Sequence, residues 1–158
     1  MEHCASFFGH RDYNDNEEDN LRVLSQMEFA IKNLNIQSFM IGCNGGFDKC
    51  VIRYLYNLKK EKYPGIKIYL VLDYLDRNFD EYDTKVLEKY CDEILYPPIE
   101  KVMKRYAIYY RNKWMVDNSE YVIFYVKHSW GGASKMMEYA KKCGKKYTNI
   151  AISTNSRV

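Results

Sequence analysis

The sequence predicts an α/β fold, a Rossmann-like three-layer sandwich in which helices cover both faces of a mostly parallel sheet. Short apolar runs alternate with longer stretches in which apolar residues recur every three or four positions, which is typical of βαβ units. The run YVIFYV at 121–126 is continuously apolar, as expected of a strand covered on both sides. The 158 residues suit one domain, so we expect a single domain over 1–158.

The first half of the chain predicts three strands and the two helices between them. Strands are expected where β-branched and aromatic residues gather, at 3–8, 38–42 and 66–72. The first helix has its predicted apolar face at Leu21, Leu24, Met27, Ile31 and Leu34. The second has it at Phe47, Val51, Leu55 and Leu58. This second helix ends before Pro64 and Gly65, which cannot continue it.

The second half continues the alternation after a long acidic loop at 73–83. Further strands are expected at 93–96, 121–126 and 147–152, with 121–126 the best candidate for a central strand. Helices are expected near 82–90, 100–118 and 132–143. Gly144 then provides a left-handed cap for the last helix. The helix at 100–118 shows one face made of Met103, Ala107, Tyr110 and Trp114.

The composition indicates an ordered cytoplasmic protein. Apolar residues make up 47% and aromatic residues 16% of the chain, more than a disordered chain carries. The beginning of the sequence does not resemble a signal peptide, and no run reaches the ~18 apolar residues of a membrane span, so we expect no membrane partner. The net charge of +3 is too small to make a strong case for nucleic acid, which we regard as an unfavoured partner.

Cysteines and histidines give no metal-binding pattern. The five cysteines form no CxxC pair, which favours reduced and mostly buried thiols. The three histidines are far apart in the sequence and form neither HxH nor HxxxH. We therefore expect neither a metal nor a cofactor.

Three polar, glycine-containing segments follow predicted strands: GHRD at 9–12, CNGGFD at 43–48 and HSWGG at 128–132. Open α/β sheets bind ligands outside the carboxyl ends of their strands, so these loops predict one shared site. The pairs Gly45-Gly46 and Gly131-Gly132 are either tight turns or cradles in which helix N-termini hold a phosphate. Neither GxGxxG nor GxxxxGK[ST] is present, which argues against a dinucleotide dehydrogenase and an NTPase.

Several side chains in these loops have two interpretations. His10 and Arg11 suit binding of a phosphate or a ligand hydroxyl, or Arg11 forms a surface ion pair while Asp12 caps a turn. His128 is either an acid or base or an ordinary loop histidine. The segment KRYAIYYRNKW at 104–114 suits stacking with single-stranded nucleic acid, but helical spacing favours packing of its aromatics on the sheet, with a solvated basic edge.

Taken together, CASFFGHRD, GCNGGFD, the segment from YPPIEK to YVIFYV, and HSWGGASKMMEYAKKCGKK resemble the YpsA-like branch of the SLOG superfamily. That Rossmann-like group also includes the LOG phosphoribohydrolases and the DprA proteins. The resemblance runs over most of the chain. It implies a nucleotide-binding domain and, by analogy with LOG proteins, a homodimer or higher homo-oligomer formed through the tyrosine-rich helix.

The LOG motif implies specific roles for several residues. Its Arg and terminal Glu, which serve hydrolysis of the N-glycosidic bond of a nucleoside 5′-monophosphate, correspond to Arg111 and Glu138. Its remaining motif positions correspond to Met115, Ser119, Glu120, Gly131 and Gly132. The chain departs from the motif at Asn112, Trp130, Ser134 and Lys135, the last two replacing the Gly-Thr that lines the phosphate. This departure weakens the expectation of hydrolysis and leaves that of nucleotide binding.

We therefore expect the chain to bind a nucleotide or nucleotide-derived small molecule as a sensor or ligand-sequestering protein. The alternatives are a LOG-like hydrolase and, third, a DprA-like single-stranded DNA binder. Arg111 and Glu138 are the candidate catalytic residues if it is an enzyme. The candidate ligand-binding residues are Gly9, His10, Arg11, Gly45, Gly46, Asp48, Ser129, Gly131 and Gly132.

Overall fold

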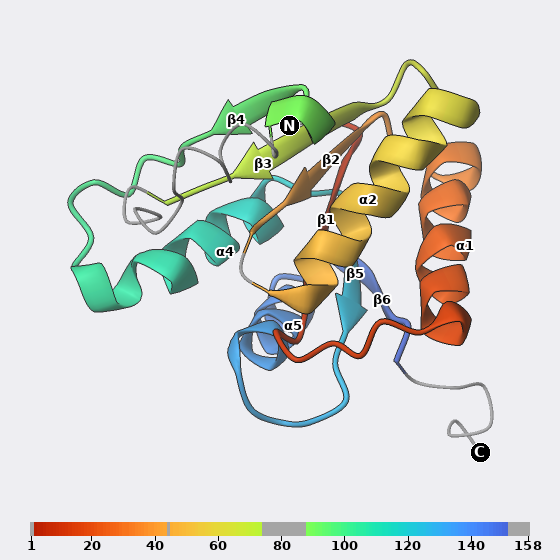
Figure 1. Ribbon diagram of the computed structural model, residues 1–158. Helices are drawn as coiled ribbons and strands as arrows, with labels where there is room; N and C mark the ends of the chain where they lie inside the picture. Colours follow the sequence, from red (N-terminus) through yellow and green to blue (C-terminus); the bar gives the residue numbers. More distant parts are fainter. Residues whose placement is uncertain (1, 44, 74–87, 152–158) are drawn as a thin grey trace.

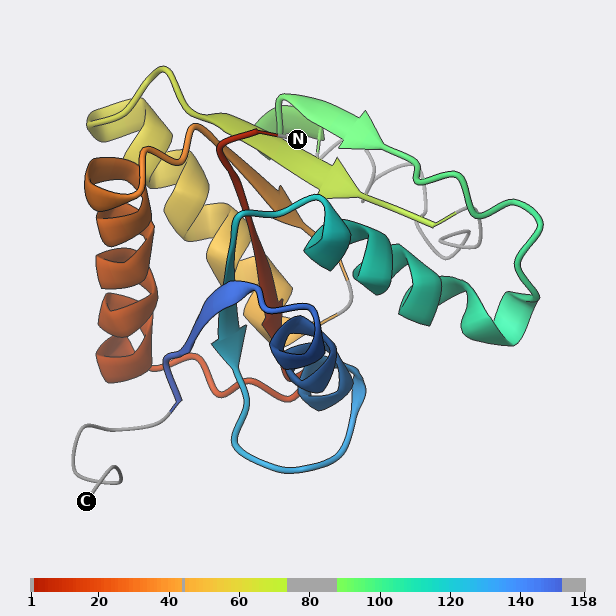
Figure 2. The ribbon, with the colours of Figure 1, turned by 180° about the vertical axis from the view of Figure 1, so that it is seen from behind.

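The computed structural model describes residues 2–43, 45–73 and 88–151. These residues form a six-stranded sheet in the order β4-β3-β2-β1-β5-β6, in which every neighbouring pair is parallel. The strands are β1 Cys4–Gly9, β2 Ser38–Ile41, β3 Lys67–Val71, β4 Glu93–Leu95, β5 Tyr121–Tyr125 and β6 Lys146–Asn149. Figures 1 and 2 show helices on both faces of this sheet, which confirms the predicted α/β sandwich.

In the described part of the chain, two helices of 11 residues or more lie on each face. The helices α1, Glu17–Asn33, and α2, Gly46–Glu61, cover the face seen in Figure 1. The helices α4, Ala107–Asp117, and α5, Gly132–Lys142, cover the face seen in Figure 2, and a 3₁₀ turn at Lys104–Tyr106 leads into α4. Because the chain runs from β1 through β2 and β3 to β4 on one side and reaches β5 and β6 on the other, the strand order reverses beside β1.

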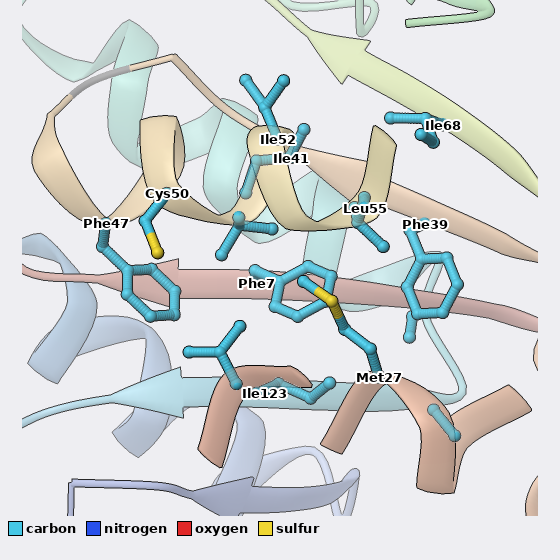
Figure 3. Packing of buried hydrophobic residues seen from close by; sticks show 14 of the residues in the cluster. Phe7, Met27, Phe39, Ile41, Phe47, Cys50, Ile52, Leu55, Ile68 and Ile123 are labelled. Carbon is cyan, nitrogen blue, oxygen red and sulfur yellow. The ribbon is translucent and has the colours of Figure 1, made fainter. Parts of the chain in front are cut away.

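The alternation of side chains along each strand divides the interior into two cores. Ala5 and Phe7 of β1 face α1 and α2, whereas Cys4 and Phe8 face α4 and α5. Figure 3 shows Phe7 between Met27 of α1 and Leu55 of α2. Burial of these apolar side chains on both faces is the main term that stabilises the sandwich.

Local sequence signals account for the helix ends. The Asn16 side chain accepts a hydrogen bond of 2.8 Å from the Asp19 backbone N–H and so caps α1. Gly144, just beyond α5, has the predicted left-handed conformation, with φ of 65°. Within the described residues no helix is both long and apolar enough to cross a membrane.

Some elements differ in detail from their prediction. The strand at 121–126 is fully buried and internal, as its apolar run predicts, but it lies second from the β6 edge while β2 and β1 hold the middle. In α1, Leu21 is 55% exposed, because the inward face is set by Val23, Met27 and Ala30. Nearly all of the predicted loop 73–83 and most of the predicted helix 82–90 lie outside the described residues, and the described part, 88–90, is helical.

The predicted inner face of the helix at 100–118 is correct at Ala107 and Trp114 and wrong at Met103 and Tyr110. The face toward the sheet contains Ala107, Arg111 and Met115, while Met103 is 59% and Tyr110 42% exposed. Hydrophobic periodicity assigns apolar residues to the inward positions, but here a buried guanidinium takes one of them. The Tyr110 side chain, which the sequence placed against the sheet, is consequently turned outward, whereas Trp114 is partly buried and packs against the core.

Candidate functional site

A cavity of about 410 Å³ opens at the carboxyl ends of β1 and β5, where the strand order reverses. This is the edge at which open α/β sheets bind their ligands, and the volume falls within the range of about 300–1,000 Å³ typical of small-molecule sites. The wall comes from four parts of the chain: the end of β1 with the loop after it, the residues around Gly42 and Asp48, helix α4, and the loop from His128 into α5. The three loops that the sequence singled out therefore converge.

The loop after β1 is held by close packing against α2. A Cβ on Gly9 would lie 2.2 Å from the Phe47 ring, so only glycine lets α2 pack this closely on the strand. The N–H of Gly46 donates a 2.9 Å hydrogen bond to the carbonyl oxygen of Arg11, and a Cβ on Gly45 would lie 2.6 Å from the Arg11 Cα. The Gly45-Gly46 pair thus fixes the loop that carries His10 and Arg11.

Three aromatic rings form a continuous stack along the cavity. The rings of His10 and His128 lie 3.7 Å apart between centroids, and those of His128 and Trp130 lie 3.6 Å apart, each pair with an interplanar angle of 14°. The Nδ1–H of His128 donates a 2.9 Å hydrogen bond to the carbonyl oxygen of Trp130. All three side chains line the cavity.

The inner ring of this stack is a neutral histidine. His10 is only 8% exposed, and its Nε2 accepts a 2.8 Å hydrogen bond from the backbone N–H of Lys127. Burial, followed by the nearby charge of His128, lowers the pKa of His10 below its ordinary value. The accepted hydrogen bond and the lowered pKa both favour the imidazole over the imidazolium.

A buried cation lies on the α4 side of the cavity. Arg111 is 3% exposed, and its Nε and Nη2 donate hydrogen bonds of 3.2 and 2.9 Å to the Asn112 side-chain oxygen. A Cβ on Gly42 would lie 3.2 Å from both Arg111 Nη2 and Asp48 Oδ2, so the guanidinium and the carboxylate both border this glycine. The absence of a side chain at Gly42 leaves room for both charged groups.

The N-terminus of α5 faces the same space. Its N-cap, Gly131, has φ of 96° and provides no side-chain hydrogen bond, and Gly131, Gly132 and Ala133 all line the cavity. A Cβ added to Gly132 would meet no atom within 4 Å, so the space in front of this turn is open. First-turn N–H groups have no carbonyl partner within their helix and carry partial positive charge, which makes this turn suited to an anion.

The structure brings together seven of the eleven residues selected from the sequence. Those lining the cavity are Gly9, His10, Arg11, Asp48, Arg111, Gly131 and Gly132. Gly45, Gly46, Ser129 and Glu138 are not part of the lining. The Glu138 side chain is 68% exposed and lies 3.4 Å from the Lys141 ammonium in an ion pair on the second turn of α5. The acid that the LOG motif places beside the ligand is therefore in solvent.

Sequence reasoning missed several contributors to the wall, among them Trp130 and Asn112. Trp130 was noted only as a departure from the LOG motif, and Asn112 likewise, yet both line the cavity. The position of Trp130 directly before the glycine pair of a predicted phosphate loop was the available signal. Among the described residues no group of three or more His, Cys, Asp or Glu side chains is arranged to hold a metal ion.

Comparison with known proteins shows the fold. No protein-family model and no curated protein matches the chain. Among solved structures it is similar to the X-ray structure of DNA processing protein A (DprA) from Streptococcus pneumoniae, with a TM-score of 0.64 and 17% sequence identity. The match covers 90% of this chain and 48% of that chain, so the chain spans about half the length of this DprA. The DprA-like fold implied by the SLOG resemblance is thus shown.

Proposed function

We propose that the chain forms a nucleotide-binding domain of the YpsA-like kind, which binds a nucleotide or nucleotide-derived small molecule as a sensor or ligand-sequestering protein. The main observation that supports this proposal is that one cavity is lined by three features: the uncapped N-terminus of α5, the Arg111 guanidinium and the stack of aromatic rings. A phosphate suits the first two, and a planar base or a ribose suits the rest of the wall.

Binding without turnover is favoured by what the cavity contains. Cleavage of an N-glycosidic bond needs a carboxyl group positioned at that bond, and Glu138 points into solvent. The acids that do line the cavity are Asp12, which is exposed, and Asp48, which borders Gly42. Neither stands at the position that the LOG motif gives to its terminal acid.

A substitution at Gly132 tests the phosphate site without disturbing the fold. Gly132→Asp places a carboxylate in the first turn of α5, where an acid suits the helix dipole and a new Cβ meets no atom within 4 Å. We expect an unchanged or slightly raised unfolding midpoint and an affinity for phosphate-bearing ligands lowered by about tenfold or more. Gly65→Asp is the matched control, since a Cβ there also meets no atom within 4 Å and Gly65 does not line the cavity.

The measurement is titration calorimetry with AMP, cyclic AMP, ADP-ribose and NAD, combined with chromatography and mass detection of the mixtures. Saturable binding of at least one compound without breakdown, lost in Gly132→Asp and kept in Gly65→Asp, supports the proposal. Release of free base beyond one equivalent makes the protein an enzyme instead. If no compound binds, or Gly132→Asp binds as the wild type does, the proposal fails.

A second candidate function is binding of single-stranded nucleic acid, favoured by the outward aromatics at the start of α4. Tyr106, Tyr109 and Tyr110 are 44%, 39% and 42% exposed. The Arg105 guanidinium lies 5.1 Å from the Tyr106 ring, and the Lys113 ammonium lies 5.4 Å from the Tyr110 ring. Exposed rings beside cations are the features that bind bases and backbone without sequence preference. The similar structure is named for DNA processing.

Fluorescence anisotropy with a labelled oligothymidylate tests this second function. Binding is expected to weaken steeply as salt is added, because cations released from the nucleic acid drive it. Replacing Tyr109 and Tyr110 by serine is expected to weaken it by about fivefold or more. Tyr54→Ser is the control, because Tyr54 also lies beside a guanidinium, 5.6 Å from Arg53, but on α2 across the sheet. Affinity that does not change with salt excludes this function.

A further inference from the structure

Trp130 is the outermost ring of the stack that lines the cavity. One face of its indole is covered by His128 at 3.6 Å between ring centroids, yet the residue is 67% exposed. Because the residue is so exposed although one face of the indole is covered, the other face must be open to solvent. Tryptophan is highly buried on average and is enriched at binding interfaces, so an open indole face at a cavity is suited to a planar ring of a ligand.

The stack also fixes the orientation of this indole. His10 at its inner end is buried and held by the Lys127 N–H, and His128 is tied to the Trp130 carbonyl oxygen. Rings held in this way lose little conformational freedom when another ring is added, so a ligand finds a pre-organised platform. Gly131 follows directly and starts the turn that leads into the N-terminus of α5.

We infer that Trp130 is the base-recognition residue of the cavity, and that the aromatic base of the ligand stacks on its open face as a fourth ring. This inference rests on the proposed nucleotide-binding function and deepens it: the ligand is selected by its planar base as well as by its phosphate. The distance between the two parts of the site is short, since Trp130 is two residues before Gly132 in the chain. One mononucleotide unit therefore suffices to reach both.

The experiment compares ligands that share a phosphosugar and differ in the base. In a Trp114→Phe background Trp130 is the sole tryptophan, because the chain has 2. AMP, ADP-ribose and ribose 5-phosphate are titrated while indole fluorescence and calorimetric heat are recorded. We expect quenching by AMP or ADP-ribose, which carry adenine, and none by ribose 5-phosphate.

Substitution of Trp130 tests the inference through the ratio of two affinities, that for the adenine-bearing ligand and that for ribose 5-phosphate. Trp130→Ala is expected to lower the affinity for the adenine-bearing ligand by about 5-fold to 150-fold, the range for loss of one base–aromatic stack, and to leave ribose 5-phosphate binding unchanged. Trp130→Phe, which keeps an aromatic ring, is expected to retain most of the affinity for the adenine-bearing ligand that Trp130→Ala loses. Because ribose 5-phosphate reports the phosphate site in the same variant, a general disturbance of the loop is detected by its loss.

Four results overturn the inference. Equal affinity of the wild type for AMP, ADP-ribose and ribose 5-phosphate removes the base site and leaves the proposed function standing. An adenine-ligand affinity that is unchanged in Trp130→Ala, or lost together with that for ribose 5-phosphate, does the same. Failure of all three probes to bind the wild type overturns both this inference and the proposed function.

Discussion

The guanidinium of Arg111 and the carboxylate of Asp48 both border Gly42, where a single Cβ would lie 3.2 Å from an atom of each. Arg111 comes from α4 on one face of the sheet and Asp48 from the first turn of α2 on the other. Both reach Gly42, which directly follows the end of β2. A buried guanidinium at a cavity wall is positioned to donate hydrogen bonds to a ligand phosphate.

Arg111→Ala is expected to weaken binding of the phosphate-bearing ligand by about 1.5–3 kcal/mol, the value of a hydrogen bond to a charged group. Calorimetric titration measures this loss. Arg111→Lys keeps the charge without the planar fork and is expected to recover only part of it. Arg53→Ala is the control, since Arg53 pairs with Asp15 at 3.1 Å and does not line the cavity. Unchanged affinity in Arg111→Ala would remove Arg111 from the site.

Gly9 makes a prediction about stability. In Gly9→Ala the new Cβ would lie 2.2 Å from the Phe47 ring, so α2 must shift away from β1. Overpacking of this kind costs about 1–3 kcal/mol of unfolding free energy, measured by denaturant titration. Gly65→Ala adds the same methyl group where no atom lies within 4 Å, and is expected to stay within about 0.5 kcal/mol of the wild type. Equal midpoints for the two variants would contradict the packing at Gly9.

The strands and their layer order follow from patterns that the sequence carries locally. Runs such as 121–126 are apolar because both faces of a parallel strand are covered, and this local requirement is visible without the fold. The meeting of Gly9, His10 and Gly131 at one edge was likewise predictable, since parallel strands end at the same side of a sheet.

The orientation of α4 and the ring stack were not predictable from such patterns. Burial of Arg111 depends on Asn112 and on the space beside Gly42, which come from different parts of the sequence and only meet in the fold. The stack joins His10 to His128 and Trp130 across two loops, and neither loop has a periodicity that reports it. Loop side chains acquire their partners through the tertiary structure. The spacing of residues in a single sequence does not report the distances between side chains of different loops.

Glu138 provides a test of the resemblance to LOG enzymes. Because its side chain is 68% exposed and paired with Lys141, Glu138→Gln is expected to change neither ligand affinity nor any release of base by more than about twofold. Asp48→Asn, which alters an acid that does line the cavity, is the comparison and is expected to change affinity. Base release by the wild type that disappears in Glu138→Gln alone would restore Glu138 as a catalytic residue.

His10 predicts a pH dependence of stability. Burial and the charge of His128 and Lys127 lower its pKa in the folded protein, although Asp12 acts in the opposite direction. The unfolded chain therefore binds a proton at a higher pH than the folded protein does, and unfolding free energy falls as pH decreases from about 6.5 toward the lowered pKa. Above that window both states are neutral at His10 and this contribution is constant. Protonation would also remove the acceptor for the Lys127 N–H.

Denaturant titrations at about pH 7.5 and about pH 5.5 measure this loss, because they bracket the ordinary pKa of histidine. His10→Gln is the matched variant: its amide oxygen reaches about as far as Nε2 and accepts from the Lys127 N–H, but it does not titrate. We expect the wild type to lose more unfolding free energy between the two pH values than His10→Gln does. The difference between the two losses is the contribution of His10 to the pH dependence. An equal loss in both proteins would show that folding does not lower the pKa of His10. The imidazole at the inner end of the cavity would then not be kept neutral by its surroundings.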